Sequence, residues 1–214
     1  MGIDMAPTDN AFGFACYGPV LRASMYVVQT APTIAFYHND MVHMTTGGGV
    51  AILTPHLGYM PMVADDAVLA AGDFLLGSVQ AVFDEDMNPI NYMAVGRVGN
   101  GTIAGYLLIA DDPQQLFVAQ EDSTGNAITY TVTEGQCNAE VFPPALNAGN
   151  TTTGVSKQEI DSSSAANTST LMLRVLRAHP DDTPATDAYW CRYICMINTH
   201  QYGNVGVTAV TAAG

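Results

Sequence analysis

Short apolar runs closed by turn-forming residues recur from residue 71 onward, and no helical periodicity extends over a dozen residues there. The first pair of runs, 74–83 and 90–95, flanks the polar segment 84–89. Runs of this length bounded by Gly, Pro, Asn and Asp are typical of strands joined by turns. Further strands are predicted at residues 102–110, 115–120, 127–133, 170–176 and 188–197. The pattern favours a mainly β protein, folded as an antiparallel β barrel or sandwich.

Residues 1–70 differ from the rest because Pro and Gly closely follow the apolar runs. The interruptions are Pro19, Pro32, Pro55, Pro61 and the glycine triplet at 47–49. We predict an extended, irregular N-terminal region with short strands near 25–28 and 50–53, able to reach along a neighbouring surface. An irregular small subdomain packed on the rest of the chain is the alternative.

The remaining chain is expected to form a β barrel or sandwich domain over residues 71–205, followed by a C-terminal tail at 206–214. A chain of 214 residues leaves both one domain and two domains open. Residues 135–166 are rich in Ser, Thr, Asn and Ala, so we expect a long polar excursion there. Long loops are uncommon in compact domains unless they are functional, which makes 135–166 an interface candidate; surface disorder is the other interpretation.

Charged residues are scarce, at 12% of the chain, so the surface must be built largely from small polar side chains and Gly. Such a surface suits a protein whose faces are covered by neighbours. The net charge of −14 argues against nucleic-acid binding, because the five arginines are scattered and Lys157 is the one lysine. The acidity is expected to serve solubility and like-charge repulsion away from the site of assembly.

The segment that begins at Met1 has neither the basic nor the apolar part of a signal peptide. No apolar run approaches the ~18 residues of a membrane span. We therefore expect a soluble protein made in the cytoplasm, without a membrane partner.

Four cysteines occur, and the closest pair is Cys191 and Cys195. On a strand, positions four apart lie on one face but ~13 Å from each other, too far for a disulfide or a shared metal. Cys16, Cys137, Cys191 and Cys195 are therefore expected to be buried free thiols.

Metal binding is not predicted. The densest group of ligand-type residues is His38, Asp40 and His43, with His56 farther along, but two histidines five apart share neither a helix face nor a strand face. Asp84, Asp86 and Asn88 resemble the start of a calcium loop, yet Pro89 replaces the required glycine and Val95 the final glutamate. We interpret 84–89 as a turn.

Catalysis is not predicted either. The serines of 161–164 lack a nucleophile elbow, and Gly99, Gly101 and Gly105 miss the dinucleotide-binding spacing and precede a strand. No catalytic, metal-binding or cofactor-binding residue is assigned, no cofactor is expected, and the chain is interpreted as a non-enzyme.

Several segments, taken in order, are similar to those of one known family. They are 104–106, 111–113, 117–123, 149–154, 161–166, 171–176, 189–190 and 197–201. Over residues 72–201 this ordered set resembles the decoration (cement) proteins found beside the major capsid protein of tailed bacteriophages.

The resemblance implies a structural protein of the virion, located on the outer capsid surface. Its partner would be the major capsid protein, which it would bind across neighbouring coat subunits to stiffen the shell. Self-association as a trimer or dimer, giving a homo-oligomer on the capsid, would raise the avidity of weak contacts. The interface candidates are then the N-terminal region, as a coat-binding arm, and residues 135–166.

Two other functions stay open. A phage tail or receptor-binding module would use Tyr189, Trp190 and Tyr202 as an aromatic platform for a ligand. A hydrolase or metalloenzyme would use His38, Asp40, His43 and His56. Copy number in the particle separates the first from decoration, and elemental analysis tests the second.

Overall fold

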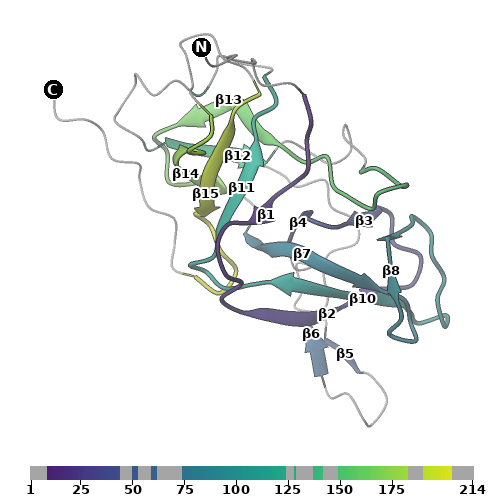
Figure 1. The fold of residues 1–214 in the computed structure, drawn as a ribbon. Helices are drawn as coiled ribbons and strands as arrows, with labels where there is room; N and C mark the ends of the chain where they lie inside the picture. Colours follow the sequence, from purple (N-terminus) through teal and green to yellow (C-terminus); the bar gives the residue numbers. More distant parts are fainter. Residues whose placement is uncertain are drawn as a thin grey trace, which may run out of the picture.

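The structure is a computed structural model that describes residues 9–43, 50–52, 59–61, 74–123, 128, 137–141, 149–182 and 190–203. Every regular element in these ranges is a strand, and the strands form two larger antiparallel sheets (Figure 1). The sheets pack together as an open sandwich and do not close into a barrel. The prediction of a mainly β fold is confirmed, with the sandwich as the form that the chain adopts.

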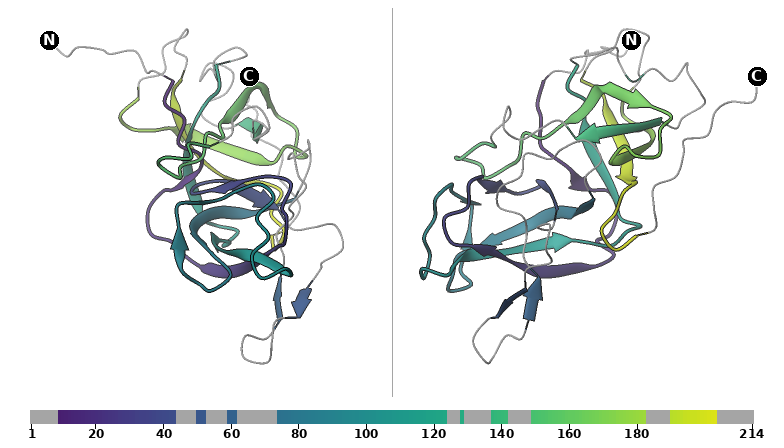
Figure 2. Two further views of the ribbon diagram at one scale, coloured as in Figure 1. Left: turned by 90° about the vertical axis from the view of Figure 1, so that its right-hand side faces the viewer. Right: turned by 180° about the vertical axis from the view of Figure 1, so that it is seen from behind.

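The larger sheet has six strands in the order β1-β11-β15-β14-β12-β13. Their bounds are Ala15–Cys16 (β1), Leu116–Gln120 (β11), Arg192–Ile197 (β15), Leu173–Ala178 (β14), Cys137–Val141 (β12) and Ile160–Ala166 (β13). It occupies the upper part of the molecule in Figure 1 and is seen from behind in Figure 2.

The smaller sheet has the order β2-β10-β7-β4, and β8 pairs with the end of β7. These strands are Ala23–Gln29 (β2), Ile103–Ala110 (β10), Leu75–Phe83 (β7), Met41–His43 (β4) and Pro89–Ile90 (β8). Two further pairs are Phe36–Tyr37 (β3) with Tyr92–Met93 (β9), and Val50–Ile52 (β5) with Tyr59–Pro61 (β6).

The strand β10 shows why this sheet forms where it does. It is apolar throughout and lies between β2 and β7, so both of its faces are buried. Leu107 contributes to one core cluster and Tyr106 to another. A Cβ atom at Gly105 would lie 2.2 Å from the carbonyl oxygen of Phe83, so the pairing of β10 with β7 requires glycine at this position.

The core that joins the sheets is shared by both. Phe117, Leu173 and Tyr193 come from the six-stranded sheet, whereas Leu75 and Met41 come from β7 and β4 of the other sheet. Each of these five residues is at most 2% exposed. A second cluster, which includes Phe36 and Leu107, fills the far side of the five-stranded sheet.

The prediction of an extended N-terminal arm requires a correction, because the described part of this region does not lie apart from the two sheets. β1 pairs with β11, β2 with β10 and β4 with β7, so residues 9–43 contribute strands to both sheets. The boundary at residue 71 therefore does not separate two structural units. Residues 1–8, 44–49, 53–58 and 62–73 lie outside the described residues, and so does the tail at 206–214.

The excursion at 135–166 is also more ordered than its composition predicts. It supplies β12 and β13, which pair with each other at one edge of the six-stranded sheet. Between them, residues 149–159 run back to the other sheet, where the Ser156 amide donates to the His38 carbonyl. The described part of the excursion thus ties the two sheets together, and residues 142–148 lie outside the described residues.

Candidate functional site

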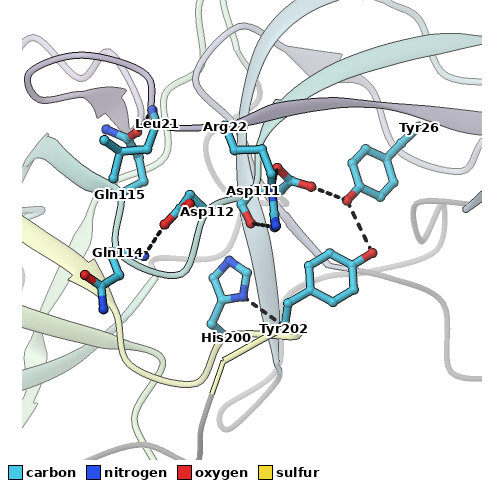
Figure 3. Close-up of polar contacts among 9 residues, drawn as sticks. All are labelled: Leu21, Arg22, Tyr26, Asp111, Asp112, Gln114, Gln115, His200 and Tyr202. Atoms are coloured by element: carbon cyan, nitrogen blue, oxygen red, sulfur yellow. Dashed lines mark hydrogen bonds and ion pairs between the residues drawn. The ribbon is translucent and has the colours of Figure 1, made fainter.

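A polar site with several connected side chains lies where the segments 20–26, 111–115 and 198–202 meet (Figure 3). We call this site the junction; its residues are Leu21, Arg22, Tyr26, Asp111, Asp112, Gln114, Gln115, His200 and Tyr202. The segments come from the start of β2, the end of β10 and the end of β15, so the junction joins both sheets.

Asp111 is the centre of the junction. Its carboxylate accepts a hydrogen bond from Arg22 Nε at 2.8 Å and another from the Tyr26 hydroxyl at 2.7 Å. The same guanidinium donates to the Asp111 carbonyl oxygen at 2.6 Å. Burial opposes ionisation of Asp111, but the bonds from Tyr26 and Arg22 outweigh it and hold the pKa of the carboxyl below its usual range. Asp111 is therefore an anion matched by Arg22.

Tyr202 covers the outside of this ion pair. The Arg22 guanidinium lies 5.7 Å from the centre of the Tyr202 ring, a cation–π distance. The hydroxyl oxygens of Tyr202 and Tyr26 are 3.3 Å apart. Burial raises the pKa of Tyr26 far above its usual range, so this hydroxyl keeps its proton and acts as a donor to Asp111.

His200 fixes the other side of the junction. Its Nδ1 accepts a hydrogen bond from the Tyr202 amide at 2.9 Å, and the backbone at His200 bridges to Leu75 in β7. Burial lowers the pKa of His200, so the ring is neutral at pH 7 and suited to this acceptor role. The bridge between His200 and Leu75 holds the chain that follows β15 against the five-stranded sheet.

The polar groups of the junction are paired with one another. Asp111 is held as an anion by its donors, and the neutral His200 ring is bound to its own strand end. Leu21 and Tyr202 are exposed beside Arg22, whose side chain is 46% exposed. The junction therefore presents a partly apolar surface with one cationic group.

Buried carboxyl groups form two other noteworthy sites. Burial raises the pKa of Glu121 to about 7, against the opposing backbone bonds from Ile128 and Cys191. Burial likewise raises the pKa of Asp40 to about 7, although Ser156 and the Tyr37 amide bond to its carboxylate. Both groups lie inside the fold, so we assign them to stability rather than to binding.

The residues of the hypothetical metal site are not brought together as ligands. The Asp40 carboxylate is engaged by its own turn, and His38 Nδ1 lies 3.1 Å from the Gln80 carbonyl oxygen. His43 ends β4, and His56 lies outside the described residues. Within the described ranges, no group of three or more His, Cys, Asp or Glu side chains is placed to hold a metal ion.

The interpretation of residues 84–89 as a turn is confirmed. Asp84 Oδ1 accepts hydrogen bonds from the backbone amides of Asp86 and Asn88, at 3.0 and 2.7 Å. The carboxylate that would bind calcium in a calcium loop therefore caps its own turn. The serines of 161–164 lie in strand β13, where the Asp161 carboxylate accepts hydrogen bonds from the Ser163 amide and hydroxyl and from the Ser164 amide.

The cysteine prediction holds in part. Cys191 and Cys195 are buried, and burial raises the pKa of both thiols. Cys16 and Cys137 are half-buried, and all four are free thiols.

The aromatic platform of the tail-module hypothesis is not assembled as expected. Trp190 precedes β15 and Tyr202 follows it, so the six-residue strand separates the two side chains. Trp190 has a left-handed φ of 68°, and its carbonyl accepts a hydrogen bond from Gln120. Tyr189 lies outside the described residues.

Sequence reasoning did not identify the junction as a site. Arg22 and Asp111 are 89 positions apart, and neither belongs to a motif that predicts their pairing. Two of the segments quoted for the resemblance, 111–113 and 197–201, meet here.

Comparison of the chain with protein-family models, curated proteins and solved structures gives no match. Among the described residues, no helix has the length and apolarity that crossing a membrane requires.

Proposed function

We propose that this chain is a non-enzymatic capsid decoration protein, which binds the outer surface of a major capsid protein lattice and stabilises the head. It acts on the virion as a cement, and its partners are coat subunits and other copies of itself. The proposal begins from the ordered resemblance over residues 72–201, and the arrangement of exposed apolar side chains supports it.

The observation that carries the proposal is the distribution of the large apolar side chains that are exposed. In the described residues they form two groups at opposite ends of the five-stranded sheet. One group surrounds the junction, and the other lies beyond the far ends of β2 and β7. The members are Val20, Leu21, Phe74 and Tyr202 at the junction, and Met87, Val95 and Val98 at the far end.

This arrangement suits a molecule that bridges two neighbours. β7 has nine residues, so the two groups are roughly 25 Å apart at about 3.3 Å per residue. Two exposed apolar groups separated in this way allow two neighbours to be contacted at once. Two weak contacts to an assembled lattice raise effective affinity by ~10² to 10⁴ when the geometry permits both.

The composition is compatible with the same role. With 12% charged residues, much of the surface is small and polar, and it can be covered by neighbours at a low desolvation cost. The net charge of −14 disfavours self-association of free molecules through unselective contacts. Binding would then depend on a complementary lattice.

Particles of the virus that encodes this chain provide the test. Quantitative mass spectrometry is expected to give hundreds of copies per particle, and particle images are expected to place a β sandwich across coat subunits. A dozen copies or fewer would instead support the tail or receptor-binding module. Absence of the chain from purified particles would overturn both assignments.

A further inference from the structure

The far end of the five-stranded sheet, formed by residues 30–33, 84–88 and 94–102, has features that define a partner. We call it the tip; it lies at the right of Figure 1, beyond β8. The Thr30 hydroxyl donates to the Val98 carbonyl, and Arg97 pairs with Glu85 at 2.7 Å, so the three segments form one surface.

Three large apolar side chains are exposed on the tip. Val95 is 60% exposed and Val98 62%, the two highest exposures among the large apolar residues of the described chain. Met87 is 41% exposed at the end of the β7–β8 turn. The loops that carry them are joined by the Arg97–Glu85 ion pair, and several exposed apolar groups in one region are typical of an interaction surface.

The backbone at Met87 is unfavourable for its side chain. Its φ is 66°, the left-handed region, in a turn where the Met87 amide donates to Asp84 and the Asp84 amide donates to Asn88. Hairpin turns of this kind normally place glycine at the left-handed position. The turn would form more easily with glycine, so the methionine side chain is not explained by folding.

The tip is also pre-organised. The Gly96 amide donates to Pro32, the Ala31 amide donates to Arg97, and Arg97 Nε donates to Ala104. These bonds fix the loops before any partner arrives. Binding would therefore cost little further ordering of the backbone.

Charge distinguishes between the partners that the tip could meet. Asp84, Glu85 and Asp86 give three negative charges against one positive charge on Arg97, a local net charge of −2. A second copy carries a net charge of −14, which opposes contact of its tip or of any other part of its surface with the acidic tip. A surface with an apolar depression bordered by Arg or Lys complements both features.

We propose that the tip docks into such a basic-rimmed apolar depression on a coat subunit. This inference rests on the proposed function and specifies the contact by its chemistry. The junction, with its exposed Arg22, is then available to the neighbouring subunit.

The test is co-sedimentation of the full-length chain with shells assembled from the major capsid protein of the same virus, expanded and unexpanded. Met87→Gly removes the side chain but keeps the turn, so the variant is expected to be at least as stable as the parent yet to bind more weakly. Combined with Val95→Ser and Val98→Ser, it is expected to weaken binding by ~10-fold or more. Far-UV circular dichroism and melting temperature confirm the fold of each variant.

A charge-reversal pair tests complementarity. Asp86→Lys lies on the tip and Asp9→Lys lies elsewhere on the exposed surface, and both change the net charge equally. The tip variant is expected to lose several-fold more affinity than its control at low salt, with the difference shrinking as salt rises.

The outcomes separate the two proposals. If the parent chain does not bind either shell, the proposed function fails and this inference fails with it. If the parent binds and the folded tip variants bind within twofold of it, this inference alone is overturned. Equal effects of the two lysine variants, or a loss of self-association instead of shell binding, also overturn it.

Discussion

Individual buried carboxyl groups in this protein change the stability of the fold in opposite directions as the pH rises. Glu121 and Asp40 have pKa values raised to about 7 by burial, so they favour the folded state at acidic pH. Asp111 and Asp182 have lowered pKa values because hydrogen bonds to arginine and other donors outweigh the effect of burial. They favour the folded state above their unfolded pKa and lose that effect as the pH falls. Stability is therefore expected to be greatest in mildly acidic solution.

Glu121→Gln tests whether the raised pKa of Glu121 favours the folded state at acidic pH. Above its unfolded pKa of ~4.3 and below about 7, the folded protein binds more protons at Glu121 than the unfolded chain does. Stability from this group thus falls by up to ~1.4 kcal/mol per unit as pH rises through that window. Urea denaturation from pH 5 to 8 is expected to show a shallower pH dependence in the variant.

The control for Glu121→Gln is Asp9→Asn, because Asp9 is an exposed carboxyl. It is expected to leave the pH dependence close to that of the parent chain. An unchanged slope in Glu121→Gln would show that Glu121 titrates as in the unfolded chain and would contradict the assignment.

At the scale of elements, the Gln158 side chain joins the excursion to β4. Gln158 Oε1 accepts from the Met41 amide at 2.5 Å, and Gln158 Nε2 donates to the Met41 carbonyl at 3.2 Å. The amide group thus takes the place of a neighbouring strand for both backbone groups of Met41. Gln158 is buried, so this contact is shielded from water.

Gln158→Glu is expected to destabilise the protein by ~1–3 kcal/mol at pH 8. The carboxylate retains an acceptor for the Met41 amide but faces the Met41 carbonyl without a proton to donate. Chemical denaturation gives the free energy of unfolding, and hydrogen exchange is expected to show faster exchange at Met41. Gln114→Glu makes the same change at an exposed position and is expected to shift stability by less than ~0.5 kcal/mol.

The sequence predicted those strands whose burial follows from their local apolar composition. β7 and β10 are long apolar runs closed by turn residues, and both were predicted nearly to their bounds. β13 was not, because Ile160–Ala166 is mainly Ser and Ala, and only its pairing with β12 makes it a strand. The place of β2 in the sheet was also missed, since it pairs with β10, far along the chain.

The junction was missed for the same reason, because it depends on pairing between segments far apart in the sequence. Asp111 was noted only within the segment 111–113, and its partners Arg22 and Tyr26 reach it from another element. Local pattern cannot indicate such a site, because long-range pairing of strands decides which side chains meet. The turn at 84–89 was predictable because the hydrogen bonds of its Asp84 carboxylate lie within five residues.

At the scale of the whole molecule, the shared core decides whether the sheets are independent. Leu75 lies in β7 yet belongs to the core cluster that contains Phe117 and Tyr193 of the other sheet. Its amide donates to the Thr199 carbonyl, and its carbonyl accepts from the Gln201 amide. Because this residue joins the sheets through both side chain and backbone, we expect them to unfold together.

Leu75→Ala tests that cooperativity. The side chain is fully buried, so the variant is expected to lose ~2–5 kcal/mol of unfolding free energy. Native-state hydrogen exchange should show the same decrease at Leu107 in β10 and at Ile194 in β15, because opening either sheet exposes the common core. Phe74→Ala, a change at the exposed neighbour, is expected to alter stability by less than ~0.5 kcal/mol. A decrease confined to Leu107 would mean that the five-stranded sheet unfolds independently, and the chain would then consist of two folding units.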